Sequence, residues 1–303
     1  MRRFTLFLLT IFVFFVVAKA LMAAEMKGLS IFPKNFDPES PYSSSWFIYN
    51  LLPGEVKKDS LVIQNNTEAA VTIKVYPVDA TTTSDGAFAL KNEDEQLSDI
   101  GGWIKLDKDK IDLPPGNSVE LPFTLSIPHT ASVGDHLGGI IIENVKLDKF
   151  QGINLKTRVG VRMYETVPGK LIRKLDLTQL TFRKDKNDHL FVDYFLKNSG
   201  NVRVEPKAKI SISYIPYGTT QEDDIDLRTV LPNNPIILPY PLKSLPPLAI
   251  VRVKTKIDYA DNPQAKIMYE ASYTYWNKKF LTAVIVGIIV LLGSTIIFKK
   301  NKK

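Results

Sequence analysis

VELPFTLSI, residues 119–127, is the stretch that decides the fold class. Apolar side chains occupy every second position, and most of the positions between them are polar or charged. A period of two is typical of a β-strand with one buried and one exposed face. Pro122 has no backbone N–H to donate, so we expect this strand to lie at a sheet edge or to contain a bulge.

The same alternation recurs on both sides of this stretch. It is found in residues 71–75, 190–196, 208–214 and 251–257. Turn-forming pairs such as Pro53-Gly54 separate the strands at short intervals, and no long window between the two ends of the chain has a convincing helical period. The pattern predicts an all-β fold with two tandem Ig-like β-sandwich domains.

The boundary between the two domains is expected after a Val-Pro-Gly turn that ends at Gly169. Residues 157–166 are predicted to form the last strand of the first sandwich, and residues 170–176 the first strand of the second. We therefore predict a first domain over residues 25–169 and a second domain over residues 170–276.

An apolar run without a charged residue, FLTAVIVGIIVLLGSTIIF, occupies residues 280–298. At ~1.5 Å per residue, a helix of this length spans about 28 Å, close to the ~30 Å hydrocarbon thickness of a bilayer. A buried core helix fits poorly, because nothing after the run could fold over it. We predict one C-terminal transmembrane helix, followed by a Lys-rich cytoplasmic tail at residues 299–303.

The other end of the chain has the pattern of a secretory signal peptide. Two arginines precede an apolar stretch over residues 4–17, and Ala-Lys-Ala at residues 18–20 supplies a small-residue cleavage site. Cleavage is expected after Ala20 or after Ala24, so residues 1–24 are assigned to the signal, and an uncleaved signal-anchor is the alternative. Either arrangement predicts a single-pass cell-membrane protein with extracellular domains and a cytoplasmic C-terminus.

The basic charge of the chain comes from its two ends. The formal net charge of +7 is accounted for by Arg2, Arg3, Lys19 and the four C-terminal lysines, so residues 21–298 are neutral overall. The charge therefore gives no indication of nucleic-acid binding. The chain has no cysteine, so burial must stabilise it without disulfides, and this composition favours a bacterial surface of the Gram-positive kind.

An ordered set of short motifs distinguishes the first predicted domain. The motifs are LLPG at 51–54, LVIQN at 61–65, WIKL at 103–106, LPPG at 113–116, FTLSIP at 123–128, GDHLGGI at 134–140, RVGVRMY at 158–164 and VPG at 167–169. In this order they resemble the peptidoglycan-binding domain of WxL-interacting proteins, over roughly residues 28–169. The second domain is only a distant match to the host-binding domain of that family.

The resemblance implies a surface protein with a signal peptide, two β-sandwiches and one C-terminal membrane helix. Its implied role is to attach to peptidoglycan or another wall polymer, to a partner surface protein, or to both. The alternative hypothesis is an accessory subunit of an envelope assembly or secretion complex that binds only proteins.

Residues suited to catalysis or to metal binding are sparse. The three histidines are dispersed, and the sequence contains no nucleophile elbow, P-loop or dinucleotide fingerprint. We expect a binding protein rather than an enzyme, with no cofactor and no metal. The acidic residues 222–226 lack the alternating oxygen ligands and the glycine of a calcium loop, so we expect a solvated loop there.

The candidate ligand-binding residues are Trp103, Arg158 and Arg162. Aromatic rings stack on sugar faces, although Trp103 is also a candidate for the sandwich core. Arg158 and Arg162 lie four apart on an alternating strand and share one face, where they would engage phosphate or carboxylate groups. A solvated sheet face is the alternative. Trp276, with Tyr273 and Tyr275, is expected at the membrane–water interface.

Overall fold

The computed structural model describes residues 28–300, apart from 41, 84, 85, 146, 147, 151, 152, 156 and 261–263. For residues 148–150, 153–155, 219, 220 and 295–300 it describes the backbone alone. The predicted signal peptide, residues 1–24, lies outside the described residues, as do residues 301–303 of the predicted tail.

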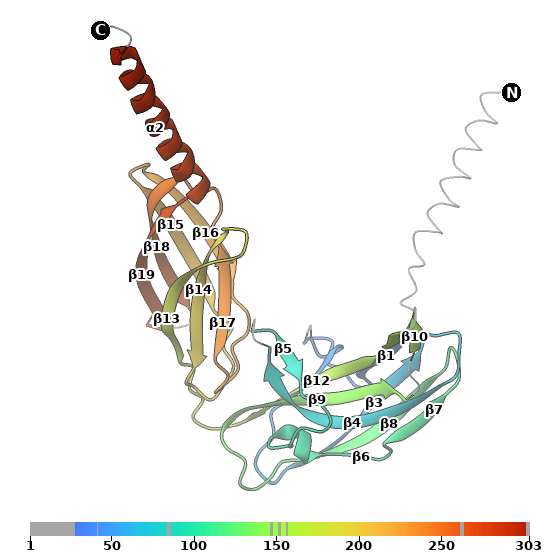
Figure 1. The fold of residues 1–303 in the computed structure, drawn as a ribbon. Helices are drawn as coiled ribbons and strands as arrows, with labels where there is room; N and C mark the ends of the chain where they lie inside the picture. The colour runs from blue at the N-terminus through green and yellow to red at the C-terminus, as the bar shows by residue number, and fades with distance from the viewer. Residues whose placement is uncertain are drawn as a thin grey trace, which may run out of the picture.

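Residues 28–167, called the first unit below, fold into two facing sheets and a separate pair of antiparallel strands (Figure 1). The elements are β1 (Leu29–Pro33), β2 (Trp46–Tyr49), β3 (Val56–Asn65), β4 (Val71–Thr82), β5 (Phe88–Leu90), the 3-10 helix η1 (Ile100–Trp103), β6 (Ile104–Leu106), β7 (Lys110–Leu113), β8 (Ser118–Ser126), β9 (Gly134–Asn144), β10 (Asp148–Phe150), β11 (Ile153–Leu155) and β12 (Arg158–Val167). One sheet has the order β1-β3-β8-β6 and the other β2-β12-β9-β4-β5, with β7 paired to β4. Strand β2 runs parallel to β12.

The core of the first unit lies between its two sheets. Strand β8 contributes Leu121, Phe123 and Leu125, each at most 2% exposed. Ile140 of β9 faces them from the other sheet as part of the same cluster. Each such side chain stabilises the fold by about 1.5–3 kcal/mol relative to an exposed position. The alternation in residues 119–127 is therefore confirmed as the inward pattern of β8.

Strand β8 lies inside its sheet and pairs with β3 in unbroken register, so the prediction of an edge strand or a bulge at Pro122 is wrong. Pro122 is opposite Ser60 of β3 on one side. On the other side the short strand β6 ends with the pair Leu106–Phe123, so that ladder does not extend to the proline. A proline is tolerated at this interior position because the second neighbouring strand, β6, ends before Pro122 and does not require a backbone N–H from it.

Residues 175–276, called the second unit, form a smaller sandwich. Its strands are β13 (Leu175–Lys184), β14 (Leu190–Asn198), β15 (Lys207–Ile215), β16 (Thr219–Asp226), β17 (Ile236–Pro241), β18 (Leu248–Asp258) and β19 (Lys266–Trp276). The sheet β13-β14-β17 packs against the sheet β16-β15-β18-β19 around one apolar cluster. Inside this cluster the buried Tyr194 hydroxyl lies 2.8 Å from the Thr255 hydroxyl, so neither polar group is left without a partner.

Each unit has its own main core cluster, and a small buried cluster of Leu137, Tyr164 and Leu231 lies between the two units. The cluster of the first unit ends in sequence at Val167, and that of the second begins at Leu175. The predicted boundary after Gly169 falls in the segment between them. In Figure 1 the units meet at one end and lie at an angle to each other.

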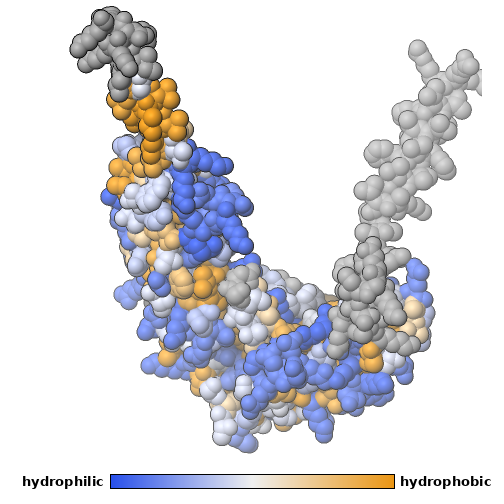
Figure 2. All heavy atoms as spheres, in the orientation of Figure 1, coloured by the Kyte–Doolittle hydropathy of each residue, from blue (hydrophilic) through white to orange (hydrophobic). Residues whose placement is uncertain are grey.

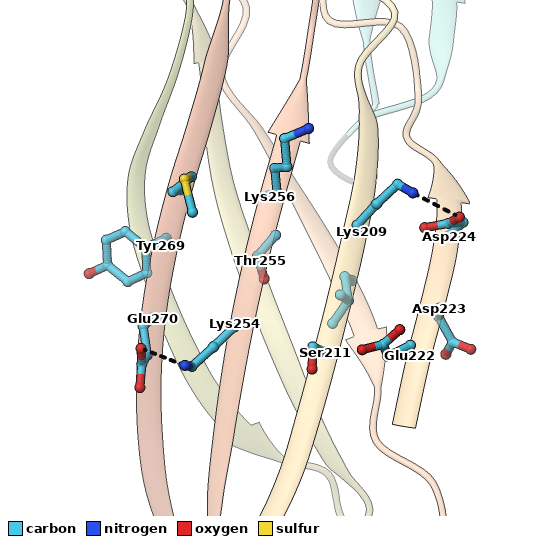
Figure 3. Close-up of a pocket in the computed structure, with 12 residues that line it drawn as sticks. Lys209, Ser211, Glu222, Asp223, Asp224, Lys254, Thr255, Lys256, Tyr269 and Glu270 are labelled. Atoms are coloured by element: carbon cyan, nitrogen blue, oxygen red, sulfur yellow. Dashed lines mark ion pairs between the residues drawn. The ribbon is translucent and has the colours of Figure 1, made fainter. Parts of the chain in front are cut away.

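Acidic residues 222–226 belong to strand β16, so the prediction of a loop is wrong. Outward-facing carboxylates of β16 pair with lysines of the neighbouring strand, as in the ion pairs Lys209–Asp224 at 3.5 Å and Lys207–Asp226 at 3.7 Å. Figure 3 shows this charged outer face. Strand β16 is an edge strand, and its charges discourage pairing with a further strand. No group of His, Asp and Glu within the described part of the chain is arranged to hold a metal ion.

The predicted membrane segment lies in a helix, α2 (Lys278–Lys300), at the end of the second unit. Ile289, Val290 and Leu291 are between 62% and 66% exposed, and Figure 2 shows the described part of the helix as an apolar column. The all-β fold with one C-terminal helix is thus confirmed. Among the described residues, however, no helix is both long and apolar enough to cross a membrane.

The aromatic residues just before α2 differ in their exposure. Trp276 is 45% exposed, whereas Tyr275 is 5% exposed and belongs to the core of the second unit. Tyr273 is half-buried and stacks on Phe182, with ring centroids 5.2 Å apart. The prediction of an interfacial position is therefore wrong for Tyr275, because its alternating position on β19 turns it inward.

Candidate ligand-binding groove

Strand β12 presents both predicted arginines on its outer face. Val161 and Met163 point into the core and are at most 2% exposed, while Arg158 and Arg162 occupy alternate positions on the opposite side. The shared face predicted for the two arginines is therefore confirmed. Gly160 lies between them on the same side, so no side chain projects from the middle of this face.

Three depressions follow the outer face of β12, with volumes of about 620, 210 and 490 Å³. The first and second share Arg158, and the second and third share Phe88 and Arg162. Because they share lining residues, they form one continuous surface, which we call the β12 groove. The predicted arginines stand at its two junctions.

The glycine at the middle of the groove allows the side chain of Leu90, at the end of strand β5, to pack over β9 and β12. A Cβ atom on Gly160 would lie 2.6 Å from the Leu90 side chain, and one on Gly139 would lie 3.0 Å from it. Since real Cβ atoms essentially never approach to 2.6 Å, a larger residue at Gly160 would force the Leu90 side chain to move. The floor of the groove is thus formed by Leu90 packed on backbone.

One end of the groove is aromatic. The rings of Tyr42 and Trp46 are stacked, with centroids 4.8 Å apart and an interplanar angle of 10°. The Arg162 guanidinium lies 5.2 Å from the Trp46 ring centre and 4.5 Å from that of Phe88. Each cation–π contact of this kind contributes about 0.5–1 kcal/mol at an exposed site. The contacts hold the Arg162 donors in one orientation beside a flat apolar wall.

The parallel pairing of β2 with β12 places Trp46 at this end. Its register sets Trp46 opposite Arg162 and Ile48 opposite Tyr164. Side chains at paired positions lie on the same face, so the indole and the guanidinium become neighbours. Sequence reasoning missed Trp46, because no local pattern reveals a parallel pairing between residues so far apart.

The second unit supplies the opposite wall of the aromatic end, with Arg203, Glu205 and Arg228 among the lining residues. Val204 and Val230 form an antiparallel bridge and are buried, so the residues alternating with Val204 face outward. The Arg203 guanidinium lies 4.8 Å from the Tyr164 ring centre. Nothing in the sequence linked these residues to β12.

Arg158, at the other junction, is held within the protein. Its guanidinium donates to Asn92 Oδ1 at 2.7 Å and to the Lys91 carbonyl at 2.9 Å. Beside it, burial raises the pKa of Tyr76 to about 12, against the lowering effect of the Arg158 charge. Arg158 therefore fixes the segment after β5. In the described part of the chain, Arg162 differs from it and makes no ion pair with a carboxylate.

Trp103 lies away from the groove. It is half-buried against the core of the first unit, and its ring centre is 4.5 Å from that of His136. Burial lowers the pKa of His136, but hydrogen bonds to Asp99 and to the Ser132 carbonyl outweigh this effect, so the pKa is raised overall. Trp103 thus has the position expected of a packing residue.

Another depression, of about 710 Å³, lies on the outer face of β15, β16, β18 and β19 (Figure 3). Its lysines are all paired, as in Lys254–Glu270 at 3.6 Å and Lys256–Asp258 at 2.8 Å. Exposed pairs of this kind contribute about 0–1 kcal/mol each. Since its cations are already neutralised, this face is a weaker candidate than the β12 groove.

The molecule is thus an all-β protein of two sandwiches, with a candidate ligand-binding groove on the outer face of β12. Residues 31–144 match the family described as WxL Interacting Protein, peptidoglycan binding domain. The resemblance drawn from the motifs of the first unit is thereby confirmed. The match includes Trp46 and Phe88 and ends before β12.

Several solved structures are similar in part. They include the class 5 fimbriae chaperone CfaA (12% identity, 80% of this chain and 98% of that chain, TM-score 0.37) and the Pseudomonas aeruginosa chaperone CupB2 (11%, 75%, 97%, 0.35). A complex of the Salmonella enterica SafA pilin with the SafB chaperone is comparable (11%, 84%, 99%, 0.37). No curated protein matches this chain.

Proposed function

We propose that this protein is a membrane-anchored bacterial cell-surface binding protein that attaches to peptidoglycan or another wall polymer, alone or together with a partner surface protein. The match of residues 31–144 to a peptidoglycan-binding domain carries the proposal. The protein acts by binding and catalyses no reaction. Its wall-binding domain is residues 25–169, and residues 170–276 form a second domain between the wall and the membrane.

The β12 groove is the proposed contact with the wall. It combines the two features that sugar polymers require, a flat aromatic wall at Trp46 and oriented donors at Arg162. The guanidinium presents its N–H groups in a fixed plane, which suits the two oxygens of a carboxylate or phosphate. Sugar stacking and ion pairing would act on neighbouring parts of one ligand.

The apolar run at residues 280–298 supports the proposed anchor, with the domains outside and the lysine-rich tail inside. Leu248, Ile250 and Trp276 add to it, because they are between 45% and 51% exposed on neighbouring strands at the end of the sheet where α2 begins. Such an apolar rim suits contact with lipid headgroups and chains. Protease added to intact cells should cleave the domains, and full-length protein that stays in the cytosol would refute the anchor.

Wall binding is tested by sedimentation: full-length protein in detergent is mixed with purified insoluble peptidoglycan, and the protein retained on it is measured. We expect the wild type to sediment with the peptidoglycan and Trp46→Ala and Arg162→Ala to remain in solution. Arg252→Ala is the control, since Arg252 is an exposed arginine on the second unit, outside the β12 groove. A wild type that stays in solution, while envelope proteins co-purify with it, would instead favour the accessory subunit that binds only proteins.

A further inference from the structure

The aromatic end of the β12 groove is a cleft between the two units. Its volume is about 490 Å³, and it is lined from one side by Trp46, Phe88 and Arg162 and from the other by Arg203 and Arg228. A ligand that fills the cleft therefore contacts both units at once.

A buried ion pair fixes the two walls relative to each other. The side chain of Asp135, in the first unit, is 2% exposed and lies 2.9 Å from Arg203 Nη1 of the second unit. The same carboxylate accepts hydrogen bonds from the Arg203 backbone N–H at 2.7 Å and from Thr166 Oγ1 at 2.7 Å. A carboxylate this well satisfied holds its partners rigidly, and removing it would leave a cation without compensation.

Backbone contacts close the same junction. The Asp135 N–H donates to the Asn201 carbonyl at 2.8 Å, and Asn201 Nδ2 donates to the Val133 carbonyl at 3.0 Å. Gly134 has φ +124°, and a Cβ atom there would lie 2.1 Å from the Asn201 oxygen. The close approach of the two units thus depends on Gly134, and this approach determines the position of the cleft wall that the second unit forms.

The charges of the cleft are unequal. Three guanidinium groups line it against one carboxylate, that of Glu205. The charge of Arg203 is compensated by Asp135 below it, whereas Arg162 is held by the rings of Trp46 and Phe88. A guanidinium positioned by aromatic rings keeps its N–H edge available for an anion.

We propose that this cleft between the units binds an anionic segment of a wall polymer, a sugar-linked group that carries a carboxylate or a phosphate. Arg162 and Arg228 face the anion from opposite walls, and the Tyr42–Trp46 stack contacts the apolar face of the adjoining ring. The second unit thereby completes a binding site that the first unit alone lacks. The proposal rests on the proposed attachment to the wall and specifies where and by which charge it occurs.

The test measures the affinity of full-length protein in detergent for three insoluble probes. One is peptidoglycan with its peptide stems and attached polymers, the second is the same material stripped of phosphate polymers by hydrofluoric acid, and the third is chitin, a neutral glycan. We expect binding to the first probe, loss of that binding as salt is raised, and none to chitin. Binding kept on the second probe assigns the anion to carboxylates, and binding lost there assigns it to phosphates. Chitin bound as tightly as peptidoglycan would overturn the proposal.

Variants separate the cleft from the rest of the protein. Arg162→Ala and Arg228→Ala should each weaken binding to peptidoglycan at least tenfold, and Asp135→Asn should weaken it by a similar factor by loosening the second wall. Arg252→Ala should change it less than twofold. Circular dichroism melting establishes that each variant is folded, and exposed Arg228 is not expected to affect folding. If the wild type binds peptidoglycan but Arg228→Ala binds equally well, the composite site is wrong and the proposed function stands. If the wild type binds neither form of peptidoglycan, both fail.

Discussion

Glu165→Gln should make the fold more stable at pH 8 and leave it nearly unchanged at pH 4. Glu165 lies on the inner side of β12 and is 0% exposed. Its Oε1 atom accepts a hydrogen bond from the Leu51 N–H at 2.8 Å, whereas its Oε2 atom is buried without a hydrogen-bond partner among the described residues. A charged carboxylate in this position is poorly satisfied, and a neutral group costs less.

The size of the effect follows from the pKa of the group. Burial raises the pKa of Glu165 from 4.5 to about 7. The folded state therefore prefers the protonated acid, so its contribution to stability is fully present below about pH 4.5 and is lost as the pH rises through about 7. A shift of this size corresponds to about 3 kcal/mol of unfolding free energy.

Urea unfolding of the wild type and of Glu165→Gln, followed by circular dichroism between pH 4 and pH 8, measures this difference. The two proteins should have similar midpoints at pH 4, and the variant should have the higher midpoint at pH 8. His136 and Glu165 interact electrostatically, so the substitution also removes one cause of the raised pKa of His136, and the measured difference includes both groups. Parallel stability curves over the whole pH range would refute the reasoning that Glu165 is buried as an acid.

Three further substitutions test the packing. Phe123→Ala removes a fully buried ring from the first core and should cost about 3–5 kcal/mol, measured by urea unfolding; a cost under 1 kcal/mol would contradict its central place. Tyr194→Phe leaves the buried Thr255 hydroxyl without its partner and should lower the unfolding free energy by about 1–3 kcal/mol. Gly134→Ala should separate the units by forcing Asn201 away, seen as faster proteolysis between them; unchanged proteolysis would argue against a close junction.

Much of the strand content could be predicted from alternation alone. Residues 119–127 and 251–257 each bury one face of a sheet, so the apolar positions of their alternation are the side chains that point into the core. The shared face of Arg158 and Arg162 followed from the same period. The position of Pro122 was predicted wrongly because a proline is excluded from the inside of a sheet only where a neighbouring strand needs its N–H. Strand β6 ends before it reaches Pro122, and the sequence around residue 122 does not reveal the length of β6.

The site itself could be predicted only in part. Arg162 was singled out by its strand, but Trp46 and Arg203, which line the same cleft, come from segments far away in sequence and are brought there by a parallel pairing and by the junction of two units. Such juxtapositions depend on tertiary packing, for which one sequence contains no periodic signal. Trp103 was chosen for its chemistry, and the structure places it against the core instead.

The most direct test of the account is the dissociation constant of the full-length protein for purified peptidoglycan, measured beside that of Arg162→Ala. The account predicts saturable binding by the wild type, and a constant at least tenfold larger for the variant. Equal constants for the two proteins, or a wild type that leaves peptidoglycan unoccupied at every concentration, would contradict it.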